Sequence, residues 1–498
     1  MQTNVGVNEQ LQATLFGKRF MRAPACAVLF FSALVCMANE CSAIEPLKGL
    51  VAGAYAQDIT PPRFPISVNG NMADHLAKAA HDPLHARCLV LISGEVQVAL
   101  VTCDSCMIPR EIMDSARRRA AYRTGIPAAN ILISATHAHS CPTSAGVFQS
   151  DPDAEYVEFL ADRIVDGIVQ AWNQREPAQI GWAVAVEPGQ LFNRRWQLKD
   201  GVLGENPFGK KVDRVRMNPG YQNPDVERPA GPIDPQISLF SVQSRKGRPI
   251  ALWANYSLHY VGGVPGDFVS ADYFGEFATR VTRRLEVQDV KPAFVAAMTN
   301  GTSGDVNNVN FGKPAPGRRE PYEQIGVVAE NIAERAAEAV KTIRYASDVV
   351  LNSVDTEIDL GVRRPSDTEL AEARAQLEGK SAPLKGAPDI YARESVLLAA
   401  YPPTVKVRIQ AIRIGDLAIV SSPCETFTET GLAIKSGSPF KQTFSISLAN
   451  GYNGYLPPPE HHQWGGYETW RARSSYLAED AEPRIRETQL MLLKTLDK

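Results

Sequence analysis

The segment Ile131-Leu132-Ile133-Ser134-Ala135-Thr136-His137-Ala138-His139-Ser140 joins an apolar, β-branched run to two histidines. The run predicts a buried β-strand. Residues two apart on an extended backbone point to the same face, so both imidazoles are expected to face one place just past the strand end. Because neutral imidazole is a favoured Zn²⁺ ligand, His137 and His139 predict the start of a divalent-metal site. Two hydrogen-bonded loop histidines are the alternative.

The surrounding sequence predicts an α/β domain with a site at its strand ends. A strand over 96–103, a basic amphipathic helix over 109–124 and the histidine strand predict a βαβ-like unit. Other predicted strands also end in polar residues, and open sites of α/β proteins usually lie at such ends. These are His259 after 250–256, the turn 300–305 after 294–298, Glu425 after a strand that ends at Val420, and Tyr452 and Tyr455 after 444–450. Without an internal repeat or a clear linker, one large domain is the simplest organisation.

Composition excludes some functions. The chain has 498 residues, 44% of them hydrophobic, which is enough for one large domain or two ordinary ones. The net charge is −3 with 21% charged residues, so no basic surplus indicates a nucleic-acid partner and no acidic block indicates a disordered tail.

The N-terminal segment predicts a secretory signal peptide over residues 1–43. Lys18, Arg19 and Arg22 precede an apolar run over 23–38, and small residues follow up to Ala43. We expect cleavage after Ala43, an uncleaved anchor being the alternative. The catalytic domain is then expected over 44–498, in a secreted or periplasmic protein.

The residue types at the strand ends suit hydrolytic chemistry. Two histidines and a carboxylate are a common catalytic zinc set that leaves one position for water. Zinc lowers the pKa of that water and polarises a carbonyl. A further histidine can act as base and acid, and tyrosine hydroxyls can donate to a developing oxyanion.

These residues carry a resemblance to a known family. The segment from Thr136 to Ser140, followed by Pro142, resembles the T-H-T-H-S-G-P motif of neutral, non-lysosomal ceramidases. Further similarities are Asp58-Ile59-Thr60-Pro61-Pro62, the strand end at His259, Gly304-Asp305-Val306, Pro423-Cys424-Glu425, and Tyr455 and Tyr467 in a late aromatic loop. The likeness spans about Gly49 to the end. It implies a zinc amidase built of packed mixed β-sheets flanked by helices, layered α/β/β/α.

Carried over by position, the resemblance implies roles for seven residues. The metal ligands would be His137, His259, Glu425 and Tyr455. Substrate or transition-state contacts would come from His139, Tyr467 and Arg195. The implied substrate is N-acylsphingosine or another small-molecule or lipid N-acyl amide, which allows a peripheral contact with a membrane surface; the oligomeric state is left open.

The chain also departs from the family pattern. The resemblance is to a shorter, bacterial-type relative without the C-terminal immunoglobulin-like domain. The family's G-D-V-S-P-N corresponds to Gly304-Asp305-Val306-Asn307-Asn308, which lacks the serine. Cys141 and Cys424 replace glycines beside two ligand positions. They predict either a disulfide, which needs a Cα separation below about 7 Å, or two buried thiols; a thiolate ligand is a further alternative.

Three functions therefore compete. The first is a secreted zinc-dependent amide hydrolase in which metal-bound water attacks the carbonyl. The second is a metal-dependent esterase on the same site, and the third is a non-enzymatic binding protein with a degenerate site. Outside the site, His75, His81 and His85 are expected to be loop histidines in contact with solvent, a second metal cluster being the alternative, and the pair His461-His462 is expected to be exposed. Asp104 is expected either to orient a histidine or to cap the following helix.

Overall fold

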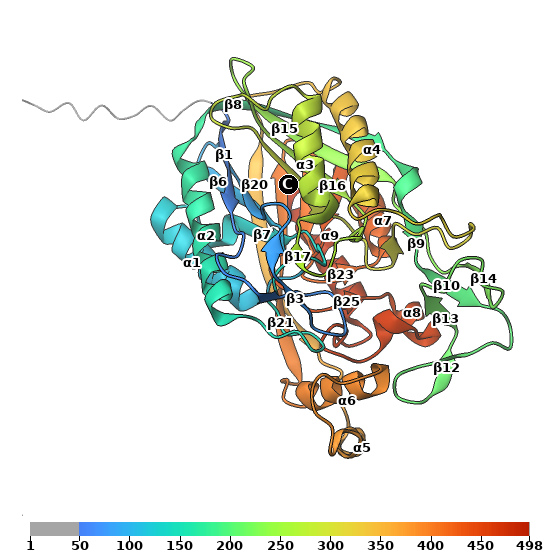
Figure 1. Ribbon diagram of the computed structural model, residues 1–498. Helices are drawn as coiled ribbons and strands as arrows, with labels where there is room; N and C mark the ends of the chain where they lie inside the picture. Colours follow the sequence, from blue (N-terminus) through green and yellow to red (C-terminus); the bar gives the residue numbers. More distant parts are fainter. Residues whose placement is uncertain (1–48, 498) are drawn as a thin grey trace, which may run out of the picture. The chain divides into compact units, whose positions relative to one another are not determined.

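An eight-stranded mixed sheet ends at the strand that precedes the two histidines (Figure 1). The computed structural model describes residues 49–497. In sheet order the strands are β18 (Val295–Asn300), β16 (Pro249–Tyr256), β15 (Gln236–Ser244), β8 (Glu176–Val186), β1 (Val51–Asp58), β5 (His85–Ser93), β6 (Val96–Cys103) and β7 (Ile131–Ala135). The histidine strand forms as predicted, and it pairs in parallel with β6 at the sheet edge. The alternation at the start of 51–62 and the prolines that follow it predict an edge strand, but β1 lies inside the sheet between β8 and β5; the prolines come after its last residue and do not interrupt its pairing.

A second sheet of four strands packs against the first. Its order is β20 (Leu351–Gly361), β21 (Thr404–Ile414), β22 (Leu417–Ser421) and β24 (Gln442–Ile446). Gly415-Asp416 between two alternating stretches predicts a hairpin, which forms between β21 and β22, and Gly415 adopts the positive φ of 60° that such a turn requires. Apolar side chains of both sheets, such as Trp253 and Phe444, form one buried cluster between them. The two sheets are thus packed face to face.

Helices cover the outer faces of both sheets. The larger sheet packs against α1 (Arg110–Thr124), α2 (Ala154–Asn173), α3 (Asp272–Arg284) and α4 (Glu323–Val340). The smaller sheet packs against α7 (Thr428–Gly437) and α9 (Ala481–Asp497). A separate apolar core lies between each pair of neighbouring layers, so the predicted α/β/β/α layering is confirmed.

Local sequence signals explain where the helices begin and end. Asp153 caps α2 by accepting a hydrogen bond from the Tyr156 amide, and Gly125 ends α1 in the left-handed conformation. The Ala- and Glu-rich stretch over 367–398 predicts an exposed helix, but it forms two helices, α5 (Asp367–Leu377) and α6 (Ala387–Leu398), and α6 buries one face. A capping box of Ser366 and Glu369 begins α5.

Short strands complete the fold. The polar stretch over 193–221 predicts a long loop, but several of these strands form within it. The remaining strands and α-helix are β2 (Ile66–Ser67), β3 (Leu76–Ala77), β4 (Ala79–Ala80), β9 (Phe192–Asn193), β10 (Arg195–Leu198), β11 (Gly204–Glu205), β12 (Lys211–Asp213), β13 (Val215–Met217), β14 (Val226–Pro229), β17 (Phe268–Val269), β19 (Val306–Asn307), β23 (Glu425–Thr426), β25 (Tyr455–Leu456) and α8 (Pro459–Trp464).

Three parallel strand–helix–strand connections point their strand ends at one region. They are β6–α1–β7, β16–α3–β18 and β22–α7–β24. The chain that leaves β24 then ties the two sheets together: the Ala135 amide donates to the carbonyl of Leu448, and the Asn450 amide donates to the carbonyl of Ile133. The segments that follow β7, β16 and β22 are thereby brought side by side.

The predicted signal peptide over residues 1–43 lies outside the described residues. The described residues, 49–497, belong to one compact unit. Within residues 49–497, no helix combines the length and the apolar character needed to cross a membrane.

Candidate active site

Two imidazoles and a carboxylate converge where three strands end. The Nε2 atoms of His137 and His259 lie 3.0 Å apart. Glu425 Oε2 lies 3.1 Å from Nε2 of His137 and 3.8 Å from Nε2 of His259. All three side chains are buried. The three atoms have the spacing of ligands around one metal ion.

Hydrogen bonds on the far side of each imidazole set the tautomer. His137 Nδ1 lies 2.8 Å from the carbonyl oxygen of Cys106, and His259 Nδ1 lies 3.0 Å from that of Ser303. A carbonyl only accepts, so Nδ1 carries a proton in each ring, and each ring in its neutral form presents the Nε2 lone pair to the centre. This is the arrangement that metal-binding histidines need.

The imidazole nitrogens and the carboxylate oxygen at the centre offer more hydrogen-bond acceptors than there are protons to share among them. Glu425 Oε1 accepts a hydrogen bond from Tyr452, whereas the buried Oε2 receives none from any group within residues 49–497. Burial opposes protonation of His137, but the Glu425 carboxylate outweighs it and raises the pKa of His137 to about 10. Burial lowers the pKa of His259 well below its usual value, which keeps this ring neutral. A divalent cation would satisfy all three acceptors, whereas one proton cannot.

The backbone conformation at His137 differs from the predicted extended one. His137 has a positive φ of 74°, so the segment is not extended beyond β7 and the expected alternation does not apply. Amide hydrogen bonds from Thr136 to Cys103 O and from His137 to Ser105 O hold this turn against the end of β6. His139 Nε2 nevertheless lies 3.1 Å from His137 Nε2, so both imidazoles face one place as predicted.

His139 is fixed from both sides. The Tyr260 ring stacks on its imidazole with centroids 3.8 Å apart and planes 15° apart. On another side Gly70 approaches so closely that a Cβ there would lie 2.5 Å from the ring. Burial lowers the pKa of His139 well below its usual value, so the ring is neutral and can accept a proton.

Glu425 and Tyr455 are neighbours on a two-stranded parallel sheet. β23 and β25 pair Glu425 directly with Tyr455, and both side chains are buried. Tyr467 follows in the same loop system, with its ring 5.7 Å from that of Tyr455. The structure therefore brings together six of the seven predicted site residues: His137, His139, His259, Glu425, Tyr455 and Tyr467. Their roles stay predictions.

Arg195, the seventh, lies elsewhere. Its guanidinium binds Glu468 and the carbonyl of Gly465, and its side chain is fully buried. Its neighbour Arg194 points to the site instead, donating 3.0 Å hydrogen bonds to the Tyr455 hydroxyl and to Glu468. Adjacent residues of an extended segment point to opposite faces, so only one of the two arginines can face the site. The hydrogen bond from the Arg194 amide to the carbonyl of Asp305 sets the pairing of this segment, and this pairing turns Arg194 inward.

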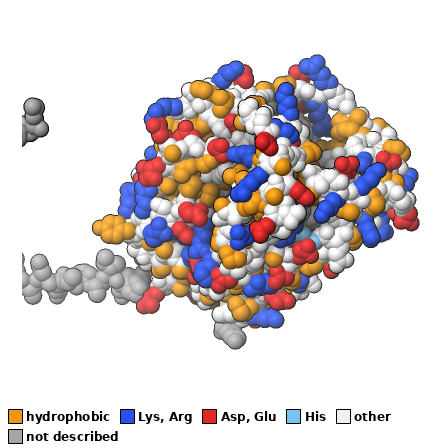
Figure 2. All heavy atoms as spheres, turned by 90° about the horizontal axis from the view of Figure 1, so that it is seen from below, with side chains coloured by type: hydrophobic (Ala, Val, Ile, Leu, Met, Phe, Trp, Pro, Cys, Tyr) orange, Lys and Arg blue, Asp and Glu red, His pale blue; other side chains and the backbone are white. Residues whose placement is uncertain are grey.

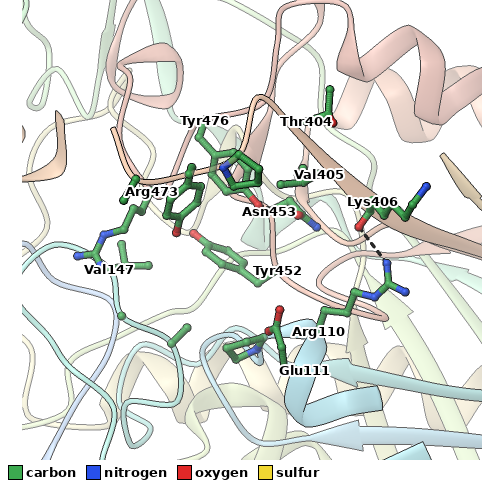
Figure 3. A pocket seen from close by; sticks show the side chains of 16 residues that line it. Arg110, Glu111, Val147, Thr404, Val405, Lys406, Tyr452, Asn453, Arg473 and Tyr476 are labelled. Carbon is green, nitrogen blue, oxygen red and sulfur yellow. Dashed lines mark hydrogen bonds between the residues drawn. The ribbon is translucent and has the colours of Figure 1, made fainter. Parts of the chain in front are cut away.

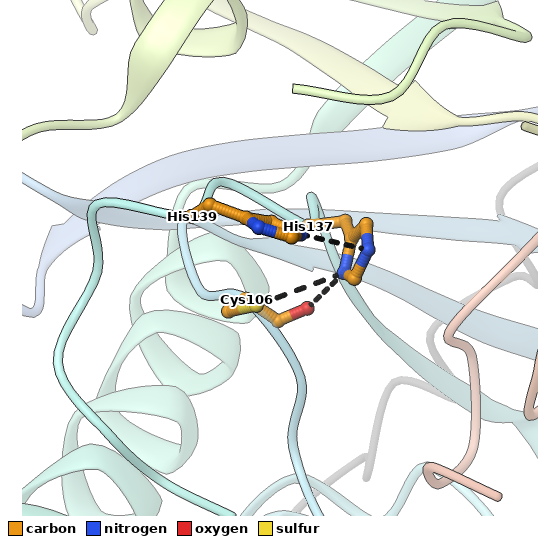
Figure 4. Close-up of side chains that lie close together, drawn as sticks. All are labelled: Cys106, His137 and His139. Carbon is orange, nitrogen blue, oxygen red and sulfur yellow. Dashed lines mark hydrogen bonds between the residues drawn. The ribbon is translucent and has the colours of Figure 1, made fainter. Parts of the chain in front are cut away.

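One cysteine, Cys106, also lies close to the site. Figure 4 shows Cys106 below His137, with its Sγ atom 3.8 Å from His137 Nδ1. Cys106, His137 and His139 are spaced closely enough to form a second candidate ligand group. Burial raises the pKa of the Cys106 thiol, however, so it stays protonated and is a poor ligand. We therefore favour the set with Glu425, and we assign Cys106 to the orientation of His137 through its carbonyl oxygen.

Several other predictions need correction. Cys141 and Cys424 are buried free thiols, so the disulfide alternative is wrong; the Cys141 thiol donates to the carbonyl of Ser270. His461 is buried and lies 3.3 Å from Glu429, because α8 turns it inward. Asp104 neither orients a histidine nor caps α1: it forms a buried ion pair with Arg87.

The outer surface shows no concentration of one charge on the face seen in Figure 2. Lys and Arg side chains are interspersed with Asp and Glu side chains there. This distribution agrees with the near-neutral net charge of −3 and offers no basic stripe of the kind that binds nucleic acid.

Comparison with known proteins connects this geometry to a family. Residues 51–315, more than half of the chain, match the family model of the N-terminal domain of neutral/alkaline non-lysosomal ceramidases. The crystal structure of a neutral ceramidase from Pseudomonas aeruginosa superposes with a TM-score of 0.65 and 17% identity, covering 90% of this chain and 75% of that one. A ceramidase complexed with C2 superposes with a TM-score of 0.67, with the same identity and coverage. No curated protein matches the chain. At this identity the likeness to the solved structures establishes the shared fold.

Proposed function

This chain belongs to the neutral/alkaline non-lysosomal ceramidase family, and on that premise we propose that it is a zinc-dependent hydrolase of ceramide-type N-acyl amides. One observation carries the proposal. His137 Nε2, His259 Nε2 and Glu425 Oε2 meet within 3.8 Å of one another in a buried place, with more acceptors than protons. Such a set supports a catalytic metal site.

The donor set suits zinc. Neutral imidazole nitrogens and a carboxylate oxygen are common ligands of a catalytic zinc ion. His137, His259 and Glu425 would hold the ion, with Tyr455 as the fourth protein ligand. When bound, zinc supplies Lewis-acid chemistry, which polarises a carbonyl and makes water a better nucleophile at neutral pH.

The chain's own side chains would supply the proton transfers. His139 is neutral and close to His137, so its imidazole can take a proton from the attacking water and return it to the leaving nitrogen. The Tyr467 hydroxyl can donate to the carbonyl oxygen as that atom gains charge. Arg194 holds the Tyr455 hydroxyl in place and adds a fixed positive charge to this side of the site.

Metal content tests the proposal. We expect about one zinc per chain in the purified wild type, and loss of zinc in His137→Ala and His259→Ala. His75→Ala is the control, because His75 lies outside the cluster. Turnover of matched N-acyl amides and carboxylic esters then separates amidase from esterase. A wild type that takes up no stoichiometric zinc would overturn the proposal and favour the binding-protein alternative.

We also propose that the protein is exported and acts in the periplasm or outside the cell. The support is the basic, apolar and small-residue pattern of residues 1–43. N-terminal sequencing of protein recovered from the secreted and periplasmic fractions tests this proposal. A mature N-terminus near residue 44 is expected, and an intact chain found only in the cytoplasm would contradict it. A lipid substrate would bring the exported enzyme to a membrane surface.

A further inference from the structure

Tyr452 is one of the side chains that line a cavity of about 650 Å³ (Figure 3). We propose that this cavity is a subsite for one arm of the substrate: an uncharged alkyl or aryl group attached to the scissile amide. We call it the Tyr452 cavity; its walls include Val147, Tyr401, Val405, Tyr452, Arg473 and Tyr476. The inference rests on the proposed hydrolase function and adds to it a place and a chemical class for part of the substrate.

The first argument is space. The interior of the candidate active site, lined by the histidines, Glu425 and Tyr455, has a volume of only about 20 Å³. This is about the room that one water molecule needs. An amide carries a substituent on each side of the bond that breaks, so both substituents must lie in neighbouring spaces while the carbonyl is at the centre.

The second argument is connection. Tyr452 and Val147 line both the small interior and the Tyr452 cavity. The Tyr452 hydroxyl donates a 3.0 Å hydrogen bond to Glu425 Oε1. One tyrosine side chain therefore separates the cavity from the carboxylate of the metal site. A group bound in the cavity would reach the centre past the Tyr452 ring.

The third argument is the chemistry of the walls. Tyr401 and Tyr476 pack edge to face with ring centroids 5.3 Å apart, and Val147 and Val405 add aliphatic surface. The cations at the rim already have partners: Arg473 binds Glu394, Lys406 binds Asp359, and Arg110 binds Asp114. Entry of an anionic group would have to compete with these carboxylates and would meet Glu111, which also lines the cavity, whereas an alkyl or aryl group gains from burial against the aromatic walls.

A second cavity leaves a place for the other arm. It has a volume of about 580 Å³ and shares Asn71 and His139 with the active-site interior. The two cavities thus adjoin the interior through different residues, Tyr452 and Val147 in one case and Asn71 and His139 in the other. A substrate that spans both would place its amide between them, next to the metal ligands.

Two variants test the assignment by changing the volume of the cavity in opposite directions. Val405→Trp fills it, and Tyr401→Ala enlarges it. Val350→Trp and Tyr122→Ala are the matched controls, since Val350 and Tyr122 are exposed and lie outside the cavity. The substrates form two series, one lengthening the acyl group from acetyl on a small amine and one lengthening the amine on an acetyl group.

We expect wild-type kcat/KM to rise in one series by up to about fourfold per methylene, as 0.8 kcal/mol of burial per methylene implies, until the cavity is full. Val405→Trp should stop this rise at a shorter chain, and Tyr401→Ala should extend it. The responding series identifies the arm.

Turnover of the acetyl substrate tests the proposed function apart from the subsite, because this substrate has no long arm. If the wild type does not turn it over, the hydrolase proposal fails. If the wild type turns it over but neither variant moves the chain-length limit, the subsite assignment is overturned. If Val405→Trp also loses the acetyl substrate, Tyr401→Ala decides.

Discussion

Arg194 donates a 3.0 Å hydrogen bond from Nη2 to the hydroxyl oxygen of Tyr455. The same guanidinium binds Glu468 and the carbonyl of Gly304, so it is held in one orientation beside the site. Its burial costs free energy, but Tyr455 and Glu468 raise the pKa of Arg194, which therefore stays charged. A fixed, buried cation next to a predicted metal ligand gives this side of the site a permanent positive potential.

We predict that Arg194→Lys lowers kcat about 100-fold while the zinc content stays near that of the wild type. A lysine retains the charge but loses the fork that holds the Tyr455 hydroxyl. Arg195→Lys is the matched control, because Arg195 contacts Glu468 and Gly465 but not Tyr455. Activity per folded molecule should separate the two variants, and equal losses in both would show that Arg194 has no special role.

The Glu468 carboxylate lies between both arginines. Its side chain is fully buried, as is that of Arg195, and Arg194 is nearly so. We predict that Glu468→Gln lowers the free energy of unfolding by about 3–5 kcal/mol, since it leaves two buried guanidiniums without their counter-charge. Urea denaturation measures the change. Glu338→Gln, which removes an exposed ion pair with Lys341, should cost less than about 1 kcal/mol; similar values for the two variants would contradict the prediction.

Periodicity and turn residues were sufficient to predict most of the scaffold. The β-branched run that ends at Ala135, the amphipathic helix that Gly125 ends, and the hairpin at Gly415 all depend on neighbours in sequence, and all form as expected. Strand position within the sheet depends on distant pairing. The place of β1 between β8 and β5 could not be inferred from its alternation.

The candidate site was predictable as a set of residues but not as a geometry. Five strand ends with polar residues indicated which side chains would meet. The choice between Arg194 and Arg195 depends on the pairing of β9 with β19, which joins residues more than 100 positions apart. Burial of His461 depends in the same way on packing against Phe427, 5.0 Å between rings. Such long-range contacts leave no periodic trace in the sequence.

His462 makes the stability depend on pH. Burial, assisted by the charges of Arg363 and Arg195, lowers the pKa of His462 to about 3. The unfolded chain takes up a proton near pH 6.5, so the folded state is favoured above that pH and loses stability as the pH falls toward 3. At pH 5 the loss amounts to about 2 kcal/mol relative to pH 8. Urea denaturation at pH 8 and pH 5 gives the free energy of unfolding of the wild type and of His462→Gln. The difference in this free energy between the two proteins should change by about the same amount from pH 8 to pH 5. A difference that does not depend on pH would refute the assignment.

Gly70 offers the sharpest test of the role of His139. Gly70 has a φ of 110°, and a Cβ there would lie 2.5 Å from the His139 imidazole. We predict that Gly70→Ala displaces His139 and lowers kcat by at least about 100-fold, while zinc content is retained because the proposed ligands His137, His259 and Glu425 are untouched.

Gly94→Ala is the matched control for this variant. Gly94 also has a positive φ, of 58°, but a Cβ there would meet nothing within 4 Å. Both alanines therefore impose backbone strain, on the order of 1 kcal/mol, but only one of them crowds a site residue. Zinc content, kcat and the free energy of unfolding should be measured for both. Retained activity in Gly70→Ala would show that His139 tolerates displacement and is not the proton carrier; an equal loss of activity in Gly94→Ala would trace the effect to strain instead of to His139.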